Sequence, residues 1–199
     1  MGKILVINGS IVEKSKSYSH AVTELFINEY QILNPDDQFE FLDLNDLPMA
    51  NQSLSRNNFS EFFNEENSGK YIKQLKSVDK LILTCSMNNF AVPAIVKNYL
   101  DHIFVANETF SYKYSKKGDA IGLLTHLKAQ IITTQGAPSD WYQWGNLATY
   151  LSKSLEFAGI KINKPLSLNG TKVKPLSEMK PEDAAMTIVE EIKKAAKEF

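Results

Sequence analysis

Cysteine is almost absent from this chain, and so are the segments that carry proteins into or across membranes. Cys85 is the single cysteine among 199 residues, so no disulfide can form within the chain. Met1-Gly2-Lys3 leads directly into a strand-like pattern without the apolar stretch of a secretory signal peptide, and no apolar run reaches membrane-spanning length. We therefore expect a cytoplasmic protein in a reducing compartment, with no membrane partner.

An excess of charge of either sign is also missing. Twenty-two basic residues stand against 23 acidic ones, which leaves a formal charge of -1. Without a positive field the chain has no general attraction for nucleic acid or for an anionic membrane surface. Its 43% hydrophobic and 23% charged residues are those of an ordinary globular protein, and we expect one domain spanning residues 1–199. The expected partner is a small molecule.

Motifs for metal binding and acid-base catalysis are lacking as well. His20, His102 and His126 stand in separate segments with no cysteine or carboxylate at metal-ligand spacing, so we expect no metal site. Cys85 ends an apolar strand without an accompanying histidine, and we interpret it as a core residue rather than a nucleophile. No dinucleotide fingerprint and no Walker loop is found, which disfavours tight binding of NAD in a Rossmann site. We assign no catalytic side chain.

What the chain does contain is an alternation of strand-like and helix-like patterns. Continuous apolar runs predict strands buried on both faces, alternation at residues 38–42 predicts a strand with one flank partly exposed, and apolar residues at helical spacing predict the helices. The expected strands are residues 4–7, 38–42, 80–85, 130–134 and 161–168, and the expected helices are residues 18–33, one near Glu61, one opened by Pro93, residues 146–157 and one from Pro181. This pattern predicts an α/β fold, a flavodoxin-like doubly wound five-stranded parallel sheet in the order 2-1-3-4-5 with helices on both faces.

Two irregular stretches interrupt the alternation. Residues 43–60 are polar and too long for a tight turn, so we expect a surface excursion there. Residues 107–127 alternate aromatic and polar residues, and Lys116-Lys117-Gly118-Asp119 is typical of a turn, which together favour a hairpin. Aromatic residues in this stretch and in a second cluster either wall an aromatic substrate site or pack at a subunit interface. They are Phe110, Tyr112, Tyr114 and the segment Trp141-Tyr142-Gln143-Trp144.

The most informative stretch follows the third strand, where Ser86-Met87-Asn88-Asn89-Phe90 precedes a helix. Open α/β sheets bind ligands at the carboxyl ends of their strands. Asn88 and Asn89 offer amide donors and acceptors, while Met87 and Phe90 offer soft and flat apolar surface, a combination that suits a flavin ring. The two asparagines are equally consistent with a turn that binds nothing, because asparagine tolerates unusual backbone angles.

The loop after the first strand makes a second candidate site. Ser10, Ser15 and Ser17 offer three hydroxyls, and Lys14 and Lys16 add positive charge just before a helix begins. The unpaired amides and the dipole of a helix N-terminus favour a bound phosphate. The alternative is that Ser15 or Ser17 only caps the helix.

The loop after the fourth strand supplies a third contact region, Thr134-Gln135-Gly136-Ala137. Its main-chain amides are suited to a ring carbonyl or ring nitrogen, and Gly136 would allow a close approach. The sequence Gly136-Ala137-Pro138 is also ordinary turn chemistry.

The motifs of these loops resemble those of the FMN-dependent NADH azoreductases, also called NADH:quinone reductases, over residues 3 to about 159. The matching residues are Ser10, Ser15-Lys16-Ser17, Met87-Asn88-Asn89-Phe90, Val92-Pro93-Ala94, Lys97-Asn98-Tyr99-Leu100-Asp101 and Thr109-Phe110-Ser111-Tyr112. The resemblance implies that Ser10, Ser15, Lys16 and Ser17 bind the FMN phosphate and ribityl groups. It implies that Met87, Asn89 and Phe90 contact the isoalloxazine ring, and that Thr134, Gln135, Gly136 and Ala137 correspond to a further loop of the family, Ser-Arg-Gly-Gly. We include Asn88 and these four residues among the cofactor-binding candidates.

The family also implies an activity, an electron donor and an assembly. By this resemblance the chain takes electrons from NADH or NADPH through FMN, reduces a quinone or an azo aromatic compound in ping-pong order, and forms a homodimer with flavin sites at the interface. Three positions depart from the family pattern, since Asn88 replaces an aromatic residue, Gln135 replaces an arginine and Ala137 replaces a second glycine. We expect the departures at Asn88 and Gln135 to alter the affinity for FMN, substrate or nicotinamide.

Three rival functions share the expected fold or family. A flavodoxin-type electron carrier is usually strongly acidic, whereas this chain is nearly neutral. A receiver-type signalling domain needs clustered acidic residues after the first strand, where Asn8-Gly9-Ser10 has none. A phosphodiesterase would need a nucleophile or a metal set, and we find neither motif.

Overall fold

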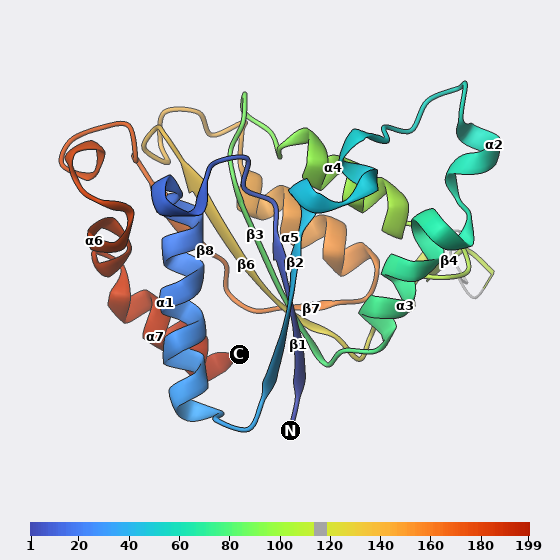
Figure 1. The fold of residues 1–199 in the computed structure, drawn as a ribbon, viewed down its shortest axis with the longest axis horizontal. Helices are drawn as coiled ribbons and strands as arrows, with labels where there is room; N and C mark the ends of the chain where they lie inside the picture. Colours follow the sequence, from blue (N-terminus) through green and yellow to red (C-terminus); the bar gives the residue numbers. More distant parts are fainter. Residues whose placement is uncertain (114–118) are drawn as a thin grey trace.

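A parallel sheet forms the centre of the protein (Figure 1). The structure, a computed structural model, describes residues 1–113 and 119–199, so Tyr114 and most of the predicted turn at 116–119 lie outside the described residues. The sheet has six strands, β1 (Lys3–Asn8), β2 (Gln38–Asp43), β3 (Lys80–Ser86), β6 (Lys128–Gln135), β7 (Lys161–Ile162) and β8 (Leu166–Asn169). All pairs are parallel, the order is β2-β1-β3-β6, and β7 and β8 both pair with β6.

The strand count corrects the prediction of five strands in the order 2-1-3-4-5. The parallel sheet is confirmed, but the predicted fifth strand at 161–168 is two short strands, β7 and β8. Pro165 lies between them and has no amide hydrogen to donate to the ladder. Asn163 is held in the same gap by its side-chain amide, which donates to Gln130 Oε1 at 2.7 Å and to the carbonyl of Ala195 at 3.0 Å.

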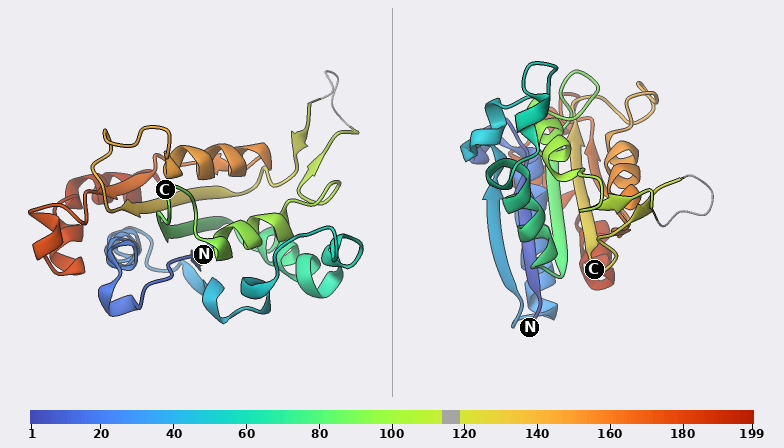
Figure 2. Two further views of the ribbon diagram at one scale, coloured as in Figure 1. Left: turned by 90° about the horizontal axis from the view of Figure 1, so that it is seen from above. Right: turned by 90° about the vertical axis from the view of Figure 1, so that its right-hand side faces the viewer.

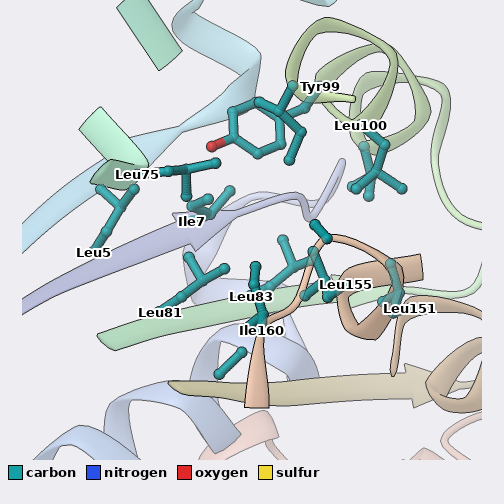
Figure 3. Packing of buried hydrophobic residues seen from close by; sticks show 14 of the residues in the cluster. Leu5, Ile7, Leu75, Leu81, Leu83, Tyr99, Leu100, Leu151, Leu155 and Ile160 are labelled. Atoms are coloured by element: carbon teal, nitrogen blue, oxygen red, sulfur yellow. The ribbon is translucent and has the colours of Figure 1, made fainter. Parts of the chain in front are cut away.

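Helices cover both faces of the sheet, as predicted (Figure 2). One face carries α1 (Tyr18–Leu33), α6 (Pro181–Met186) and α7 (Val189–Glu198), and the other carries α3 (Lys70–Lys76), α4 (Ala94–Ile103) and α5 (Leu147–Phe157). Successive strand residues point to opposite faces, so Ile4 and Val6 pack with α1 while Leu5 and Ile7 join the other core (Figure 3). Both faces of β1 are therefore buried, which explains its continuous apolar sequence.

The last helix differs from the prediction of one helix beginning at Pro181. It is divided into α6 and α7 at Thr187 and Ile188. Thr187 closes α6, because its amide and its hydroxyl both donate to the carbonyl of Ala184, at 3.2 and 2.6 Å.

The two predicted excursions are present. Residues 44–69 form short helical turns that include α2 (Phe59–Phe62), the four-residue helix that contains Glu61. Asn98 ties this segment to α4, because its side-chain amide donates to the carbonyl of Ala50 at 2.9 Å and its Oδ1 accepts from Ser53 Oγ at 3.0 Å. The predicted hairpin is the antiparallel pair β4 (Phe110–Ser111) and β5 (Ile121–Gly122). No helix among the described residues has both the length and the apolar character needed to cross a membrane.

Candidate functional site

The three loops singled out in the sequence follow neighbouring strands, β1, β3 and β6, and meet at one edge of the sheet, at the top of Figure 1. Two main-chain hydrogen bonds connect them, from Gly9 N to Thr84 O at 2.8 Å and from Met87 N to Thr134 O at 2.7 Å. A Cβ atom at Gly9 would lie 2.2 Å from Val96 Cγ2, so this close approach requires glycine. The boundary between β1 and β3 is the switch point at which open α/β sheets bind ligands.

The loop after β3 adopts a strained conformation. Asn89 and Phe90 have positive φ angles of 47° and 67°, and two hydrogen bonds between Asn88 and Ala91, at 2.9 and 3.1 Å, close the turn around them. Asparagine visits this left-handed region readily, but phenylalanine does so at a cost of about 1–2 kcal/mol. Backbone strain of this kind concentrates at functional sites, because surrounding contacts must maintain it.

This turn forms one wall of a cavity of about 490 Å³. The lining consists of Met87, Asn89, Phe90, Gly136, Ala137, Trp141, Tyr142, Lys172 and Val173. Phe90 is 44% exposed, and its ring packs against Trp144 and Tyr142, with ring centroids 4.5 and 5.2 Å away. Five of the predicted contact residues therefore come together around one space, whereas Asn88 is outside the lining and contributes the main-chain bonds of the turn.

Thr134 and Gln135 face a different environment from Gly136 and Ala137. Thr134 and Gln135 line a separate cavity of about 450 Å³ beside α5. The carbonyl of Thr134 accepts the Met87 amide, and the side-chain amide of Gln135 donates to the carbonyls of Ala137 and Pro138 at 3.0 and 3.1 Å. The contacts of Gln135 therefore stabilise the shape of the loop after β6.

In the loop after β1, hydroxyl groups form a buried chain. Ser17 Oγ lies 3.0 Å from Ser10 Oγ and 3.1 Å from Ser19 Oγ, and it accepts the amide of His20 at 3.2 Å as the N-cap of α1. Within the described part of the chain, the amides of Tyr18 and Ser19 have no hydrogen-bond acceptor. Capping by Ser17 thus coexists with two amides that remain able to bind an anion.

Ser15 and Lys16 are placed differently from Ser10 and Ser17. Both side chains are exposed, and Lys16 Nζ forms an ion pair with Glu13 Oε2 at 2.9 Å. They stand at the rim of the loop, while Ser10 and Ser17 are 2% and 3% exposed.

Sequence reasoning did not identify Lys172 and Val173, which follow β8 and line the 490 Å³ cavity. Their segment is joined to the loop after β6 by hydrogen bonds from Lys172 N to Gly136 O and from Gly170 N to Ala137 O, both 2.9 Å. The available signal was the predicted end of a parallel strand at residue 168, because whatever follows it lies at the same edge of the sheet.

The remaining candidates lie away from this cavity. Phe110 packs against Phe157 and Tyr112, with ring centroids 4.9 and 5.5 Å away, and neither Phe110 nor Tyr112 is in the cavity lining. Among the described residues there is no group of three possible metal ligands. Cys85 is fully buried, and burial raises the pKa of its thiol to about 12. His102 is buried against Phe62 with ring centroids 4.1 Å apart, and burial lowers its pKa.

The chain resembles known proteins along nearly its whole length. A family model described as a flavodoxin-like fold matches residues 2–194. The FMN-dependent NADH:quinone oxidoreductase of Malacoplasma penetrans is 52% identical over 96% of this chain and 87% of its own, and the protein of that name in Mycoplasmopsis synoviae is 47% identical over the whole of both chains.

Two solved structures have similar folds. The azoreductase of Bacillus anthracis str. Sterne has a TM-score of 0.83 at 20% identity and covers all of both chains, which shows the fold alone. The FMN-dependent NADH-azoreductase of Bacillus anthracis str. Ames Ancestor, in complex with FMN, has a TM-score of 0.74 at 25% identity over 100% of this chain and 99% of that one. The resemblance found in the sequence is thereby confirmed: the chain belongs to the flavodoxin-like family of FMN-dependent NADH azoreductases and NADH:quinone oxidoreductases.

Proposed function

We propose that this protein is an FMN-dependent NAD(P)H oxidoreductase that reduces quinones and reductively cleaves aromatic azo compounds in ping-pong order. The observation that carries the proposal is the left-handed pair Asn89 and Phe90, which brings an amide and an aromatic ring to the wall of a cavity at the carboxyl ends of β3, β6 and β8. Support for the chemistry comes from relatives named FMN-dependent NADH:quinone oxidoreductase and from the azoreductases of similar fold.

The cavity residues fit the ring of FMN. Met87, Phe90, Trp141 and Tyr142 supply apolar and flat surface, and the volume of about 490 Å³ lies within the range of small-molecule sites. At the same cavity, the amides of Gly136 and Ala137 have no acceptor among the described residues, while their carbonyls are engaged by Lys172 and Gly170. Free donors beside apolar walls match a ring that is apolar on its faces and polar at its edge.

The loop after β1 fits the phosphate of FMN. The amides of Tyr18 and Ser19 are free at the N-terminus of the 16-residue helix α1, and the buried hydroxyls of Ser10 and Ser17 adjoin them. Such amides and the positive end of the helix dipole favour an anion. We assign Ser10 and Ser17 as inner ligands, and Ser15 and Lys16 as groups that close over the phosphate from the rim.

FMN, when bound, would accept two electrons and a proton from NADH or NADPH and pass them to the acceptor, which is chemistry that the cofactor supplies. The side-chain amide of Asn89 and the main-chain amides of Gly136 and Ala137 would orient the polar edge of the ring. Trp141 and Tyr142 would exclude water from it. We assign one stacking surface to donor and acceptor, so they must bind in turn, which gives ping-pong order.

Steady-state kinetics test this proposal. Protein loaded with FMN should oxidise NADH with a small quinone as acceptor, and double-reciprocal plots at several quinone concentrations should be parallel. Asn89→Ala should lower the rate, whereas Cys85→Ser, at a buried position outside the cavity, should keep most of it. An aromatic azo dye should lose its colour under the same conditions. Intersecting lines would exclude the shared surface, and turnover without flavin would exclude the function.

We also propose that the protein works as a homodimer in the cytoplasm. Trp144, Trp141 and Tyr112 are 73%, 58% and 59% exposed, and a second copy would cover such large aromatic surfaces. The dimer would place the segment around Phe110 near the flavin site of the partner. Light scattering at micromolar concentration should give the mass of a dimer, and an active monomer would contradict this part of the proposal.

An electron carrier of the flavodoxin type is the alternative function. It would bind FMN at the same sheet edge but would show no turnover with NADH alone. Rapid, salt-insensitive reduction of the bound FMN by NADH would exclude it, and failure of NADH to reduce FMN would favour it.

A further inference from the structure

Lys172 is the one charged residue in the lining of the 490 Å³ cavity, as far as the described residues show. The eight others are apolar, aromatic or uncharged polar residues. Two lysines that line other cavities are paired with carboxylates, Lys97 with Asp101 at 2.5 Å and Lys153 with Glu156 at 2.6 Å. No carboxylate of the described residues lies within salt-bridge distance of Lys172 Nζ. The cavity therefore has a net positive character that comes from a single side chain.

The position of Lys172 is fixed by its neighbours as well as by its own backbone. Its amide donates to the carbonyl of Gly136 at 2.9 Å, and its stem passes close to the same glycine. A Cβ atom at Gly136 would lie 2.9 Å from Lys172 Cδ and 3.0 Å from Cγ. The absence of a side chain at Gly136 is what allows the lysine stem to lie along this loop. Gly136 therefore positions the lysine of the cavity lining.

We propose that Lys172 makes this site bind reduced FMN more tightly, relative to oxidised FMN, than it otherwise would, and so sets the redox balance of the bound cofactor. The inference rests on the proposed function, because it needs FMN in this cavity. Addition of two electrons and one proton to the neutral oxidised ring leaves one extra negative charge. A nearby cation stabilises that charge and affects the neutral ring little, and charge near the ring is a main way in which proteins tune flavins.

The expected effect is moderate, because the side chain is exposed at the cavity mouth and partly screened by solvent. We expect Lys172→Gln to lower the ratio of reduced to oxidised FMN affinity by roughly tenfold, which for a two-electron couple is a fall of about 30 mV in the reduction potential. High salt should shrink the difference between the variant and the wild type.

The experiment compares the holoproteins of the wild type, Lys172→Gln, Lys172→Arg and Lys174→Gln. Lys174 is the matched control, since it lies two residues away, is exposed and pairs with Glu178 at 2.5 Å outside the cavity. For each, the affinity for oxidised FMN is measured by fluorescence titration and the midpoint potential by anaerobic dye equilibration. Lys172→Gln should shift the potential downward, while Lys172→Arg and Lys174→Gln should keep the wild-type value.

A second variant tests the geometry. Gly136→Ala should move the lysine stem and shift the potential in the same direction as Lys172→Gln, and its combination with Lys172→Gln should add little. An unchanged potential in Lys172→Gln that still binds oxidised FMN would overturn the inference. A change confined to the KM for NADH would also overturn the inference, because it would show that Lys172 acts in binding the nicotinamide donor. Failure of the wild type to bind FMN would overturn the proposed function as well, so the two failures are distinguishable.

Discussion

Replacing Phe90 by alanine and by glycine separates backbone strain from aromatic packing in the loop after β3. Alanine removes the ring but keeps a Cβ atom at a φ of 67°, whereas glycine removes both. The ring packs against Trp144 and Tyr142, and each aromatic pair contributes about 0.5–1.5 kcal/mol. Phe90→Ala should therefore lower the free energy of unfolding by roughly 1–3 kcal/mol.

The glycine variant should be more stable than the alanine variant. The left-handed backbone costs an alanine about 1–2 kcal/mol, and the greater freedom of glycine in the unfolded chain offsets about 0.5–1 kcal/mol of that. We expect the free energy of unfolding of Phe90→Gly to exceed that of Phe90→Ala by about 1 kcal/mol. Both variants should bind FMN more weakly because the ring is gone. Urea unfolding of the cofactor-free proteins, followed by circular dichroism, measures the difference.

Asn107 is the control for this comparison, because it has the same φ of 67° and lies outside the cavity lining. The free energy of unfolding of Asn107→Gly should likewise exceed that of Asn107→Ala by about 1 kcal/mol, and neither variant should change the affinity for FMN. If Phe90→Ala were as stable as Phe90→Gly, while Asn107→Gly were more stable than Asn107→Ala as expected, the idea of a strained turn at Phe90 would be refuted.

Three other predictions concern single residues. Ser17→Ala should lower the free energy of unfolding by about 1 kcal/mol through loss of the helix cap and should also weaken FMN, whereas Ser15→Ala, at an exposed position, should affect FMN alone; urea unfolding and fluorescence titration distinguish the two. Because burial keeps the pKa of His102 below its ordinary value, the unfolded chain binds a proton that the folded chain does not. The free energy of unfolding should then fall as the pH drops below about 6.5, and His102→Phe should flatten that fall in a pH series of urea titrations. Since burial raises the pKa of Cys85 to about 12, its thiolate is scarce near neutral pH, and an alkylating reagent should modify it in urea far faster than in the folded protein, as mass spectrometry would show.

Much of this fold could be predicted from the sequence because two central strands, β1 and β3, are buried on both faces. Residues 4–7 and 81–83 are continuous apolar runs, and their neighbours in the sheet follow from the alternation with helices. Once the strand order was set, Met87, Asn89 and Phe90 had to lie near Gly136 and Ala137, because parallel neighbours end at the same edge.

The features that escaped prediction depend on contacts between distant segments. Lys172 reaches the cavity only because β8 pairs with β6, and the sequence around it has no motif. The break at Thr187 depends on a hydroxyl bonding back to Ala184, which helical periodicity does not reveal. The left-handed backbone of Phe90 runs against the preference of its residue type, so local propensity points away from it.

Rapid mixing of the FMN-loaded protein with NADH, without oxygen and without any acceptor, tests the central claim most directly. Electron transfer through the bound cofactor requires NADH alone to bleach the visible flavin absorbance within the turnover time, and a quinone added afterwards to restore it in full. Loss of colour only when NADH and quinone are present together would contradict the account.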